Sequence, residues 1–590
     1  MRGTRDTSTL QGISTSAILA VGAPLQPGRH PGSSVLTATM ERLPRLLGTI
    51  QATVLDADSK IVEWAGLERQ EKGTGVLAVL CSLLSLWITW KFLLRCHLSL
   101  KLRRMSLTVP SIRGGWPVLG PALKLAEGAP WDTMTRWSKE YGSIYKFSLF
   151  GNVNVVLSDP TFMKEVMRTK ITKYQKDIDF AYRPFLSLLG TGIVTSDGPK
   201  WRKQRNKVSA AFRIEVLSAV PGMSQRAVAR LAKKLDEAEE RNASVEIGEE
   251  LRHLTLQVIS EALLNLSAEE ADGTFATVYM PIVVEGHKRT WNPLRRFCPL
   301  LPAWWAHIKN QRILNDYITG IVRDRWDIIQ KEKCKSAAAN GVSHSGVADD
   351  AGGRKRDILD KVLDSLEPGE WGTAAVMQIR DEMKTFVLAG HETSASMLNW
   401  SLLELMENSE LMDKVVAESK EVFGANASLT GPLPSAEKLR GLQFTEACLR
   451  ETLRKYSVVP LVVRRCVEDT TICEEGEGGK EHFIPKGCSV HLLIKGVHER
   501  PDLWPEPMRY KPSRFMEAVA PYTFLPFIDG PRNCLGQHLS LLESKVVLSL
   551  LVNRYEFSLV NANAGEHNAW MIPTIPKHGT HITTKRRAGR

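Results

Sequence analysis

A cysteine near the C-terminus has the sequence context that most strongly indicates chemistry. Residues 527–536 read Phe-Ile-Asp-Gly-Pro-Arg-Asn-Cys-Leu-Gly, and an apolar helical pattern follows Cys534. At a helix N-terminus, the dipole and the free N–H groups favour the thiolate form of a cysteine. Gly530 and Gly536 permit a tight turn and the close approach of a flat group, and Arg532 supplies a fixed cation. A thiolate, an arginine and flanking glycines are what a haem iron with anionic propionates requires.

A second polar motif interrupts the longest helical pattern of the chain, residues 373–407. This stretch has no proline, and as a helix it would be ~50 Å long. Its centre reads Ala-Gly-His-Glu-Thr-Ser at 389–394, but a zinc-binding H-E-x-x-H is excluded because Ala395 stands where the second histidine belongs. Gly390 costs ~1 kcal/mol relative to alanine in mid-helix, so it needs a reason, such as a ligand pressed against the backbone.

Four ordered motifs together resemble those of the cytochrome P-450 family, the haem-thiolate monooxygenases. Residues 527–536 resemble its haem-binding signature, and residues 389–394 resemble its oxygen-activation motif. The remaining matches are the E-x-x-R pair Glu451 and Arg454, the second arginine Arg514 within Lys511–Phe515, and the W-x-x-x-R of Trp201 and Arg205. The resemblance covers residues 108–585 and implies one large, mainly α domain with a minor β part. Two residues depart from the pattern: Ser513 replaces a common acid, and Ile528 replaces a usually small residue.

The resemblance implies a role for each matched residue. Cys534 would be the proximal iron ligand, whose electron density favours O–O cleavage, and Phe527 would shield it from water. Thr393 and Glu392 would supply protons during oxygen activation. The alternative for Thr393 is a hydroxyl bonded to a carbonyl of its own helix. Haem propionates would be held by Arg532, Trp201, Arg205 and Arg464, with Arg465 as the alternative to Arg464, and Gly536 would border the haem. Glu451, Arg454 and Arg514 would form a structural charge network.

These roles predict an oxidoreductase that inserts one atom of O2 into a lipophilic substrate, with heme b as cofactor. A sterol or a fatty acid is the favoured substrate, and a carotenoid or another isoprenoid is the alternative. Two other functions remain open: a peroxide-rearranging haem-thiolate isomerase and a non-catalytic haem sensor. The intact pair of Glu392 and Thr393 argues against the isomerase, which needs no proton relay.

The electrons are expected to come from a separate NADPH-cytochrome reductase type flavoprotein, with cytochrome b5 as a further candidate partner. Only 56 residues follow Cys534, too few for a flavin or NADPH domain. Basic side chains crowd residues 200–207: Lys200, Arg202, Lys203, Arg205 and Lys207. The resemblance places part of this stretch on the proximal face, so an acidic flavoprotein would dock there. The alternative is a merely solvated basic helix.

An uncharged apolar run at residues 73–90 predicts a membrane anchor. The residues that follow it carry basic and no acidic side chains, so the positive-inside rule places the rest of the chain in the cytosol. We therefore expect a single transmembrane helix at 73–95 in the endoplasmic reticulum membrane. Residues 1–72 suit either a disordered tail or an organelle-targeting segment, which leaves the mitochondrion or a plastid as the alternative location.

The composition of the chain excludes several other classes of function. The 590 residues carry a net charge of +12, which is mild for this length and predicts no nucleic-acid binding. The nine cysteines form no C-x-x-C pair, so a zinc ribbon and a redox dithiol are excluded.

Along the chain we expect a connector at 96–121, the haem-thiolate domain at 108–590 and a flexible insert at 332–356. Residues 285–306 mix tryptophan with basic residues, which suits contact with lipid headgroups. The resemblance places this segment at the roof of the access channel, which implies substrate entry from the bilayer.

Overall fold

The structure is a computed structural model that describes most of the chain beyond residue 100. It describes residues 82, 85–87, 89, 101, 104–116, 119–212, 214–292, 295, 298–339, 356–367, 369–425, 427–476, 479–568 and 571–587. The chain forms two units, residues 1–98 and residues 99–590. The fold below is that of the second unit.

The predicted N-terminal segments fall largely outside this description. Residues 1–72 lie outside the described residues, and so does the predicted anchor at 73–95 apart from five helical, exposed positions between 82 and 89. Within the described parts of the chain, no helix has both the length and the apolar character needed to cross a membrane. The anchor therefore stays a prediction.

Helices dominate the second unit, which confirms the predicted mainly α fold with a minor β part. The α-helices are α3 (Ala122–Ala126), α4 (Pro130–Tyr141), α5 (Pro160–Lys164), α6 (Leu186–Leu189), α7 (Gly198–Ala211), α8 (Ile214–Glu240), α9 (Ile247–Leu264), α10 (Ala268–Ala271), α11 (Met280–Trp291), α13 (Pro302–Ala339), α14 (Ile358–Asp364), α15 (Thr373–Glu407), α16 (Ser409–Phe423), α17 (Ala436–Arg440), α18 (Gln443–Tyr456), α19 (Ile494–His498) and α20 (Gln537–Arg554). Short π turns occur at η1 (Glu165–Thr169), η3 (Ile178–Tyr182) and η5 (Asp272–Tyr279), and 3-10 turns at η2 (Ile171–Lys173), η4 (Arg183–Phe185), η6 (Pro512–Phe515) and η7 (Gly530–Arg532).

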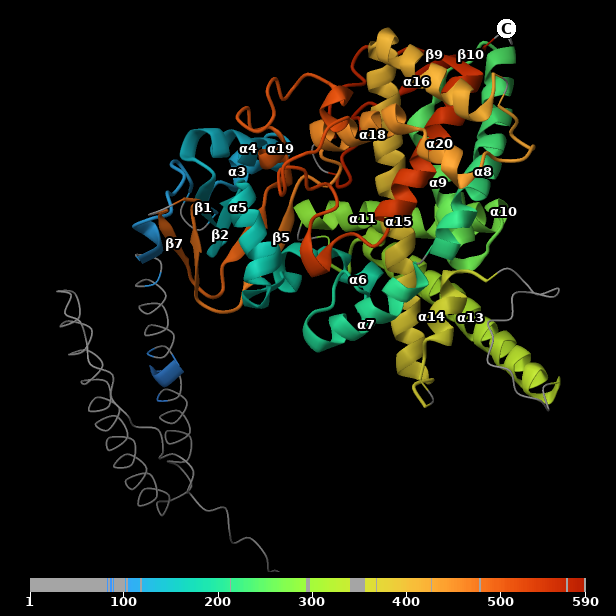
Figure 1. The fold of residues 1–590 in the computed structure, drawn as a ribbon. Helices are drawn as coiled ribbons and strands as arrows, with labels where there is room; N and C mark the ends of the chain where they lie inside the picture. Colours follow the sequence, from blue (N-terminus) through green and yellow to red (C-terminus); the bar gives the residue numbers. More distant parts are fainter. Residues whose placement is uncertain are drawn as a thin grey trace, which may run out of the picture. The chain divides into compact units, whose positions relative to one another are not determined.

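Helix α15 has the bounds that its apolar pattern predicted, and it is the element around which the site is built. It packs against α9, α13, α18 and α20 and runs through the helical part of the molecule (Figure 1). Leu398 and Leu402 of α15 share a core cluster with Val547 and Leu550 of α20, and each of the four is at most 1% exposed. Burying one such side chain contributes ~1.5–3 kcal/mol, so apolar packing fixes α15 against α20.

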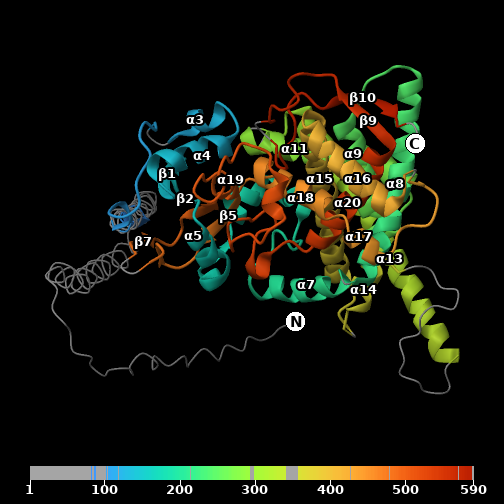
Figure 2. The ribbon, with the colours of Figure 1, turned by 45° about the horizontal axis from the view of Figure 1, so that its top comes forward.

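The strands form three small sheets. The largest has the order β1-β2-β8-β5-β3, in which β2 and β8 are parallel and the other neighbours are antiparallel. It lies on the side of the molecule that carries α3, α4 and α19, away from β9 and β10 (Figure 2). The strands are β1 (Ile144–Leu149), β2 (Asn152–Leu157), β3 (Tyr174–Lys176), β4 (Val245–Glu246), β5 (Val462–Cys466), β6 (Thr470–Cys473), β7 (Glu481–Ile484), β8 (Ser489–Leu492), β9 (Tyr555–Leu559) and β10 (His581–Arg586). The second sheet has the order β4-β10-β9, and β6 pairs with β7.

Two predicted connecting segments are described in part. In the connector at 96–121, Gly120 has a φ of +62°, and a Cβ there would lie 1.7 Å from the carbonyl oxygen of Ser148, so only glycine fits this turn. Helix α13 continues to Ala339, so the first eight residues of the predicted insert at 332–356 are helical. Residues 340–355 lie outside the described residues.

Candidate functional site

Both polar motifs of the sequence line one cavity of about 310 Å³ between α15, α7 and the start of α20. This volume lies in the range of small-molecule sites in proteins. Ala389, Gly390, Thr393 and Ser394 of α15 contribute to its wall, and so does most of the segment 526–536. Most of the other lining side chains are apolar: Ile193, Val194, Phe212, Ile259, Phe386, Met397, Leu453, Val458, Val459, Val462 and Leu539.

Cys534 is held in a tight turn and is open to this cavity. The turn requires Gly530, which has a φ of +73° and whose Cβ would lie 2.3 Å from the carbonyl oxygen of Met167. The Cys534 N–H donates to the Phe527 carbonyl at 3.0 Å, and Phe527 itself lines the cavity. Burial raises the pKa of the Cys534 thiol, although the N–H groups of Gly536 and Gln537 oppose this shift. Binding of a metal ion to the sulfur would favour its deprotonated form.

Basic side chains gather on the cavity wall beside Cys534. The Arg532 guanidinium stacks on the Trp201 ring at 3.8 Å, donates to the Ser196 carbonyl at 2.9 Å and pairs with Asp197. Arg205 donates to the Asn533 carbonyl at 2.8 Å and to its side-chain oxygen. Burial, together with neighbouring arginines, lowers the pKa of Arg532 to about 10. This cluster therefore carries more positive than negative charge and would be stabilised by an anionic ligand.

Lys176 belongs to the same basic cluster, and the sequence motifs missed it. It lines the cavity, and burial and the charges of Arg464 and Arg532 lower the pKa of its ammonium well below the usual value. Pairing of β3 with β5 places Lys176 opposite Arg464, which is buried but does not line the cavity. Arg465, the alternative to Arg464, points its guanidinium towards Ser489. No local signal in the sequence reveals Lys176, since its position depends on strand pairing.

The residues present fit a haem. Cys534 offers a sulfur ligand, the basic cluster offers partners for two propionates, and apolar side chains line most of the remaining wall. A Cβ on Gly536 would meet no described atom within 4 Å, so this glycine leaves open space at the cavity beside the thiol. Such space is what a flat ring next to the sulfur requires.

On α15, Thr393 faces the cavity and Glu392 does not. The Thr393 hydroxyl donates to the Ala389 carbonyl at 2.5 Å, which is the alternative that the sequence left open, but the residue still lines the cavity. The Glu392 carboxylate is 2% exposed and lies 3.5 Å from the Arg252 guanidinium and 3.3 Å from the His391 ring. Burial raises the pKa of Glu392, but His391 and Arg252 outweigh this effect and lower it to about 2.

Gly390 has a packing reason that the sequence did not reveal. A Cβ at this position would lie 2.5 Å from Cγ1 of Ile259, so α9 could not approach α15 as closely with any larger residue. Gly390 also lines the cavity. The glycine therefore serves helix packing as well as the expected close approach of a ligand.

The predicted charge network forms beneath the site. Arg454 and Glu451 are fully buried and joined by two hydrogen bonds of 2.8 Å, and Arg454 also donates to the His498 carbonyl at 3.0 Å. Arg514 approaches Glu451 at 3.4 Å and donates to the carbonyl oxygens of Pro505 and Glu506. These residues tie α18 to the segment before η6.

Ile528, one of the two departures from the family pattern, adopts a strained backbone. It lines the cavity and has a φ of +51°, a conformation that costs a β-branched residue ~1–2 kcal/mol. The left-handed backbone explains why a small residue is usual at this position of the motif. The strained residue lies directly beside the turn that carries Cys534.

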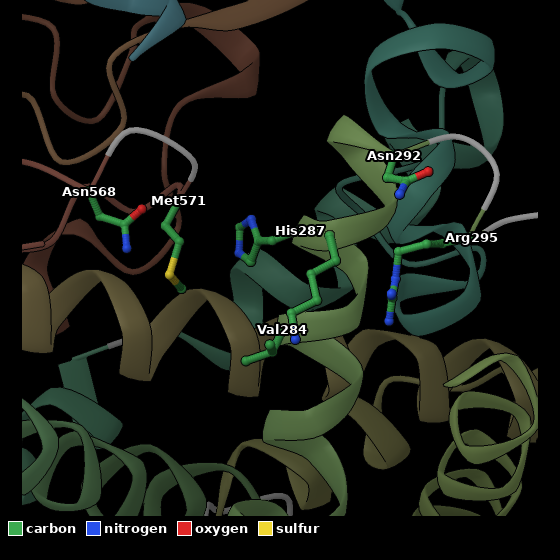
Figure 3. A pocket seen from close by; sticks show the side chains of 7 residues that line it. Val284, His287, Asn292, Arg295, Asn568 and Met571 are labelled. Carbon is green, nitrogen blue, oxygen red and sulfur yellow. The ribbon is translucent and has the colours of Figure 1, made fainter. Parts of the chain in front are cut away.

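A second cavity of about 500 Å³ opens between α11 and the C-terminal segment. Val284, His287 and Lys288 of α11 line it together with Asn292, Arg295, Asn568 and Met571. Figure 3 shows His287 projecting from α11 towards Met571. This cavity lies at the beginning of the segment 285–306, where the sequence predicted substrate entry.

Comparison with known proteins agrees with this geometry. Residues 110–580 match the family model of Cytochrome P450. "Cytochrome P450 4c21" of Blattella germanica is 30% identical over 461 residues, which cover 75% of this chain and 87% of the relative. "Cytokinin hydroxylase" of Arabidopsis thaliana is 27% identical over 455 residues, covering 76% and 82% of the two chains. "Cytochrome P450 97B2, chloroplastic" of Glycine max is 25% identical over 494 residues, covering 74% and 81%. The chain therefore belongs to the cytochrome P450 family, whose members are monooxygenases that bind heme b through a thiolate and use O2 and NADPH-derived electrons.

Proposed function

We propose that this chain hydroxylates a lipophilic small molecule in the cavity between α15 and Cys534. The observation that carries this proposal is that Cys534 and Thr393, from motifs more than a hundred residues apart, line the same cavity. One is the residue that would hold the cofactor, and the other is the hydroxyl best placed to handle a proton beside it. An isomerase or a haem sensor would not require that hydroxyl.

Residues of this chain would hold the haem at its iron and at its propionates. Cys534 would ligate the iron, and Phe527 would limit access of water to its sulfur. Arg532, Arg205 and Lys176 would bind the propionates by charge-assisted hydrogen bonds. Trp201 would keep the Arg532 guanidinium in place by stacking, and Arg464 would add positive charge from behind the wall. When bound, the haem supplies the iron at which O2 is activated.

Thr393 is the proposed proton-holding group on the α15 side. Its hydroxyl is bonded to Ala389 and can exchange this partner for a group in the cavity. Glu392 lies off the cavity wall and is held in its charged form beside Arg252, so it does not meet the substrate. Its proposed part in passing protons to Thr393 would require the carboxylate to move away from Arg252 first.

The cavity wall supports a lipophilic substrate. Apart from the basic cluster, Asn533, Cys534 and a few hydroxyl groups, its side chains are aliphatic or aromatic, and such surfaces bind apolar molecules by excluding water. We propose a sterol or a fatty acid, with a carotenoid or another isoprenoid as the alternative. Hydroxylation is the reaction named for the Arabidopsis thaliana relative.

We propose that electrons arrive from an NADPH-cytochrome reductase type flavoprotein, or from cytochrome b5, at the exposed face of α7. This surface is smaller than the sequence suggested. Lys203 and Lys207 pair with Glu370, although Lys203 stays exposed, and Arg205 turns to the cavity. Lys200 and Arg202 are exposed as well. Docking should therefore depend on few charges and weaken with salt.

The membrane location remains part of the proposal. Leu300 and Trp305 are 90% and 60% exposed, and both lie in the segment 285–306 that would contact lipid. Contact of this segment with a bilayer would bring lipophilic molecules to the second cavity. The endoplasmic reticulum is the proposed membrane, with the mitochondrion or a plastid as the alternative.

Substitution Thr393→Ala tests the function. In haem-loaded protein with reductase and NADPH, lauric acid and cholesterol are screened by the shift of the Soret band, and the compound that binds is used as substrate. The variant should keep haem and substrate binding but release most reducing equivalents as hydrogen peroxide. Thr135→Ala is the matched control, because Thr135 makes the same type of helix bond, to the Trp131 carbonyl at 2.8 Å, in α4. Unchanged coupling in Thr393→Ala would refute the role of the hydroxyl.

A further inference from the structure

One loop of the cavity wall lies unusually close to α15. In the loop Gly190–Ser196, a Cβ on Gly190 would lie 2.0 Å from Oδ2 of Asp381, and a Cβ on Gly192 would lie 2.3 Å from Oγ1 of Thr385. Gly190 also has a φ of +52°. The loop can therefore rest on the helix only because both positions are glycine.

Three side chains of α15 bind the backbone of this loop. The Thr191 N–H donates to Asp381 Oδ2 at 2.9 Å, and the Ile193 N–H donates to Glu382 Oε2 at 2.8 Å. Gln378 donates its amide to the Thr191 carbonyl at 2.8 Å. Hydrogen bonds from a backbone N–H to a carboxylate are about twice as strong as bonds between neutral groups, so the loop is firmly held.

The two carboxylates differ in how their charge is balanced. Asp381 is 4% exposed and is neutralised by Arg380 and Lys384, each at 2.9 Å. Glu382 is 2% exposed and has no ion pair among the described residues; its second oxygen accepts from Gln378 at 3.0 Å. Burial raises the pKa of Glu382 to about 7. An unpaired buried carboxylate costs stability, so this residue calls for another reason to be there.

The residue that donates the hydrogen bond to Glu382 supplies such a reason. Ile193, whose N–H Glu382 accepts, lines the cavity, and so does its neighbour Val194. The same loop ends at Ser196, whose carbonyl accepts a hydrogen bond from Arg532 at 2.9 Å. Glu382 thus fixes the position of an apolar part of the wall without touching the cavity itself.

We propose that Glu382 is a positioning residue that holds Ile193 and Val194 against the cavity and thereby limits the size of the molecule that the site admits. The inference rests on the proposed function, in which this cavity holds haem and a lipophilic substrate. Asp381 and Gln378 support the same loop at Thr191. Without the Glu382 bond, the wall at Ile193 would be free to move outward.

The test compares ligands of different size in haem-loaded protein. Imidazole, 4-phenylimidazole and clotrimazole bind haem iron through an imidazole nitrogen, and their dissociation constants follow from the shift of the Soret band. In Glu382→Ala the affinity for clotrimazole relative to imidazole should rise at least tenfold, whereas imidazole alone should bind as in the wild type. Glu382→Gln keeps an oxygen that can accept the Ile193 N–H, so it should restore the wild-type ratio.

Glu404→Ala is the matched control, because Glu404 is another buried carboxylate of α15 that bonds Lys455 and Tyr456 away from the cavity. It should lower the melting temperature without changing the ratio. Ile193→Ala removes the wall side chain and leaves the carboxylate, so it should raise the ratio even if Glu382→Ala does not fold. A wild-type ratio in Ile193→Ala or in folded Glu382→Ala, or an equal rise in Glu404→Ala, would overturn the inference. Failure of the wild type to bind haem would instead refute the proposed function.

Discussion

Glu543 on α20 is a buried acid whose ionisation should control how stability changes with pH. Its side chain is 1% exposed, and among the described residues Oε1 has no hydrogen-bond partner. Its neighbour Ser394 is bonded to the Ser540 hydroxyl at 2.9 Å, and both serines line the cavity. Burial raises the pKa of Glu543 from 4.5 to about 8, so the folded protein holds this carboxyl protonated at neutral pH.

The sign of the pH effect follows from this shift. The unfolded chain releases the Glu543 proton near pH 4.5, whereas the folded chain retains it until about pH 8. Stability from this group is therefore fully present below pH 4.5 and is lost as the pH rises towards 8. Between pH 5.5 and pH 8.0 the loss should be on the order of 3 kcal/mol, at ~1.4 kcal/mol per pKa unit.

The substitution Glu543→Gln keeps the shape of the protonated acid and removes its ionisation. Urea unfolding of the haem-loaded protein, followed by tryptophan fluorescence at pH 5.5 and pH 8.0, measures the free energy of unfolding in both proteins. The variant should be more stable than the wild type by ~1.4 kcal/mol at pH 5.5, and this difference should grow by about 3 kcal/mol at pH 8.0. Glu410→Gln, at an exposed residue of α16 that pairs with Lys414, should follow the wild type at both pH values. The same pH dependence in Glu543→Gln and the wild type would refute this account of the buried acid.

Three further substitutions test other parts of the structure. Arg454→Ala leaves the Glu451 carboxylate buried without its main partner and should cost ~3–5 kcal/mol, measured as a loss of folded protein in thermal denaturation. Gly390→Ala drives a methyl group into Ile259 and should cost ~1–3 kcal/mol, and Ile259→Ala in the same chain should recover part of that loss in melting temperature. Lys176→Met removes an amine that a bound propionate would keep protonated, so haem should dissociate faster to apomyoglobin in a transfer assay while the apoprotein remains folded.

The sequence could predict the parts of the site that are local along the chain. The bounds of α15 follow from its apolar periodicity and the absence of proline. The turn before Cys534 follows from Gly530, and the pair of Glu451 and Arg454 lies within one turn of a single helix, so their contact needs no knowledge of the fold.

The parts that sequence reasoning missed depend on tertiary packing. Lys176 reaches the basic cluster only because β3 pairs with β5. The contact of Gly390 with Ile259 needs the crossing of α15 and α9. Glu392 is next to Thr393 in the sequence, but its carboxylate lies beside Arg252 and does not line the cavity. Adjacent residues of a helix point in different directions, so the motif alone does not reveal this difference. Similarly, Glu370 neutralises two of the lysines that the sequence assigned to partner docking.

The proposal that Cys534 is the haem ligand is tested most directly by the absorption spectrum of the reduced, carbon-monoxide-bound protein. The measurement uses the wild type beside Cys534→His, with circular dichroism to show that both are folded. The wild type should show its Soret band at the position of thiolate-ligated haem, and the variant should lose that band. A wild-type band only at the histidine-ligated position, in folded protein, would contradict the assignment of Cys534 and the monooxygenase function built on it.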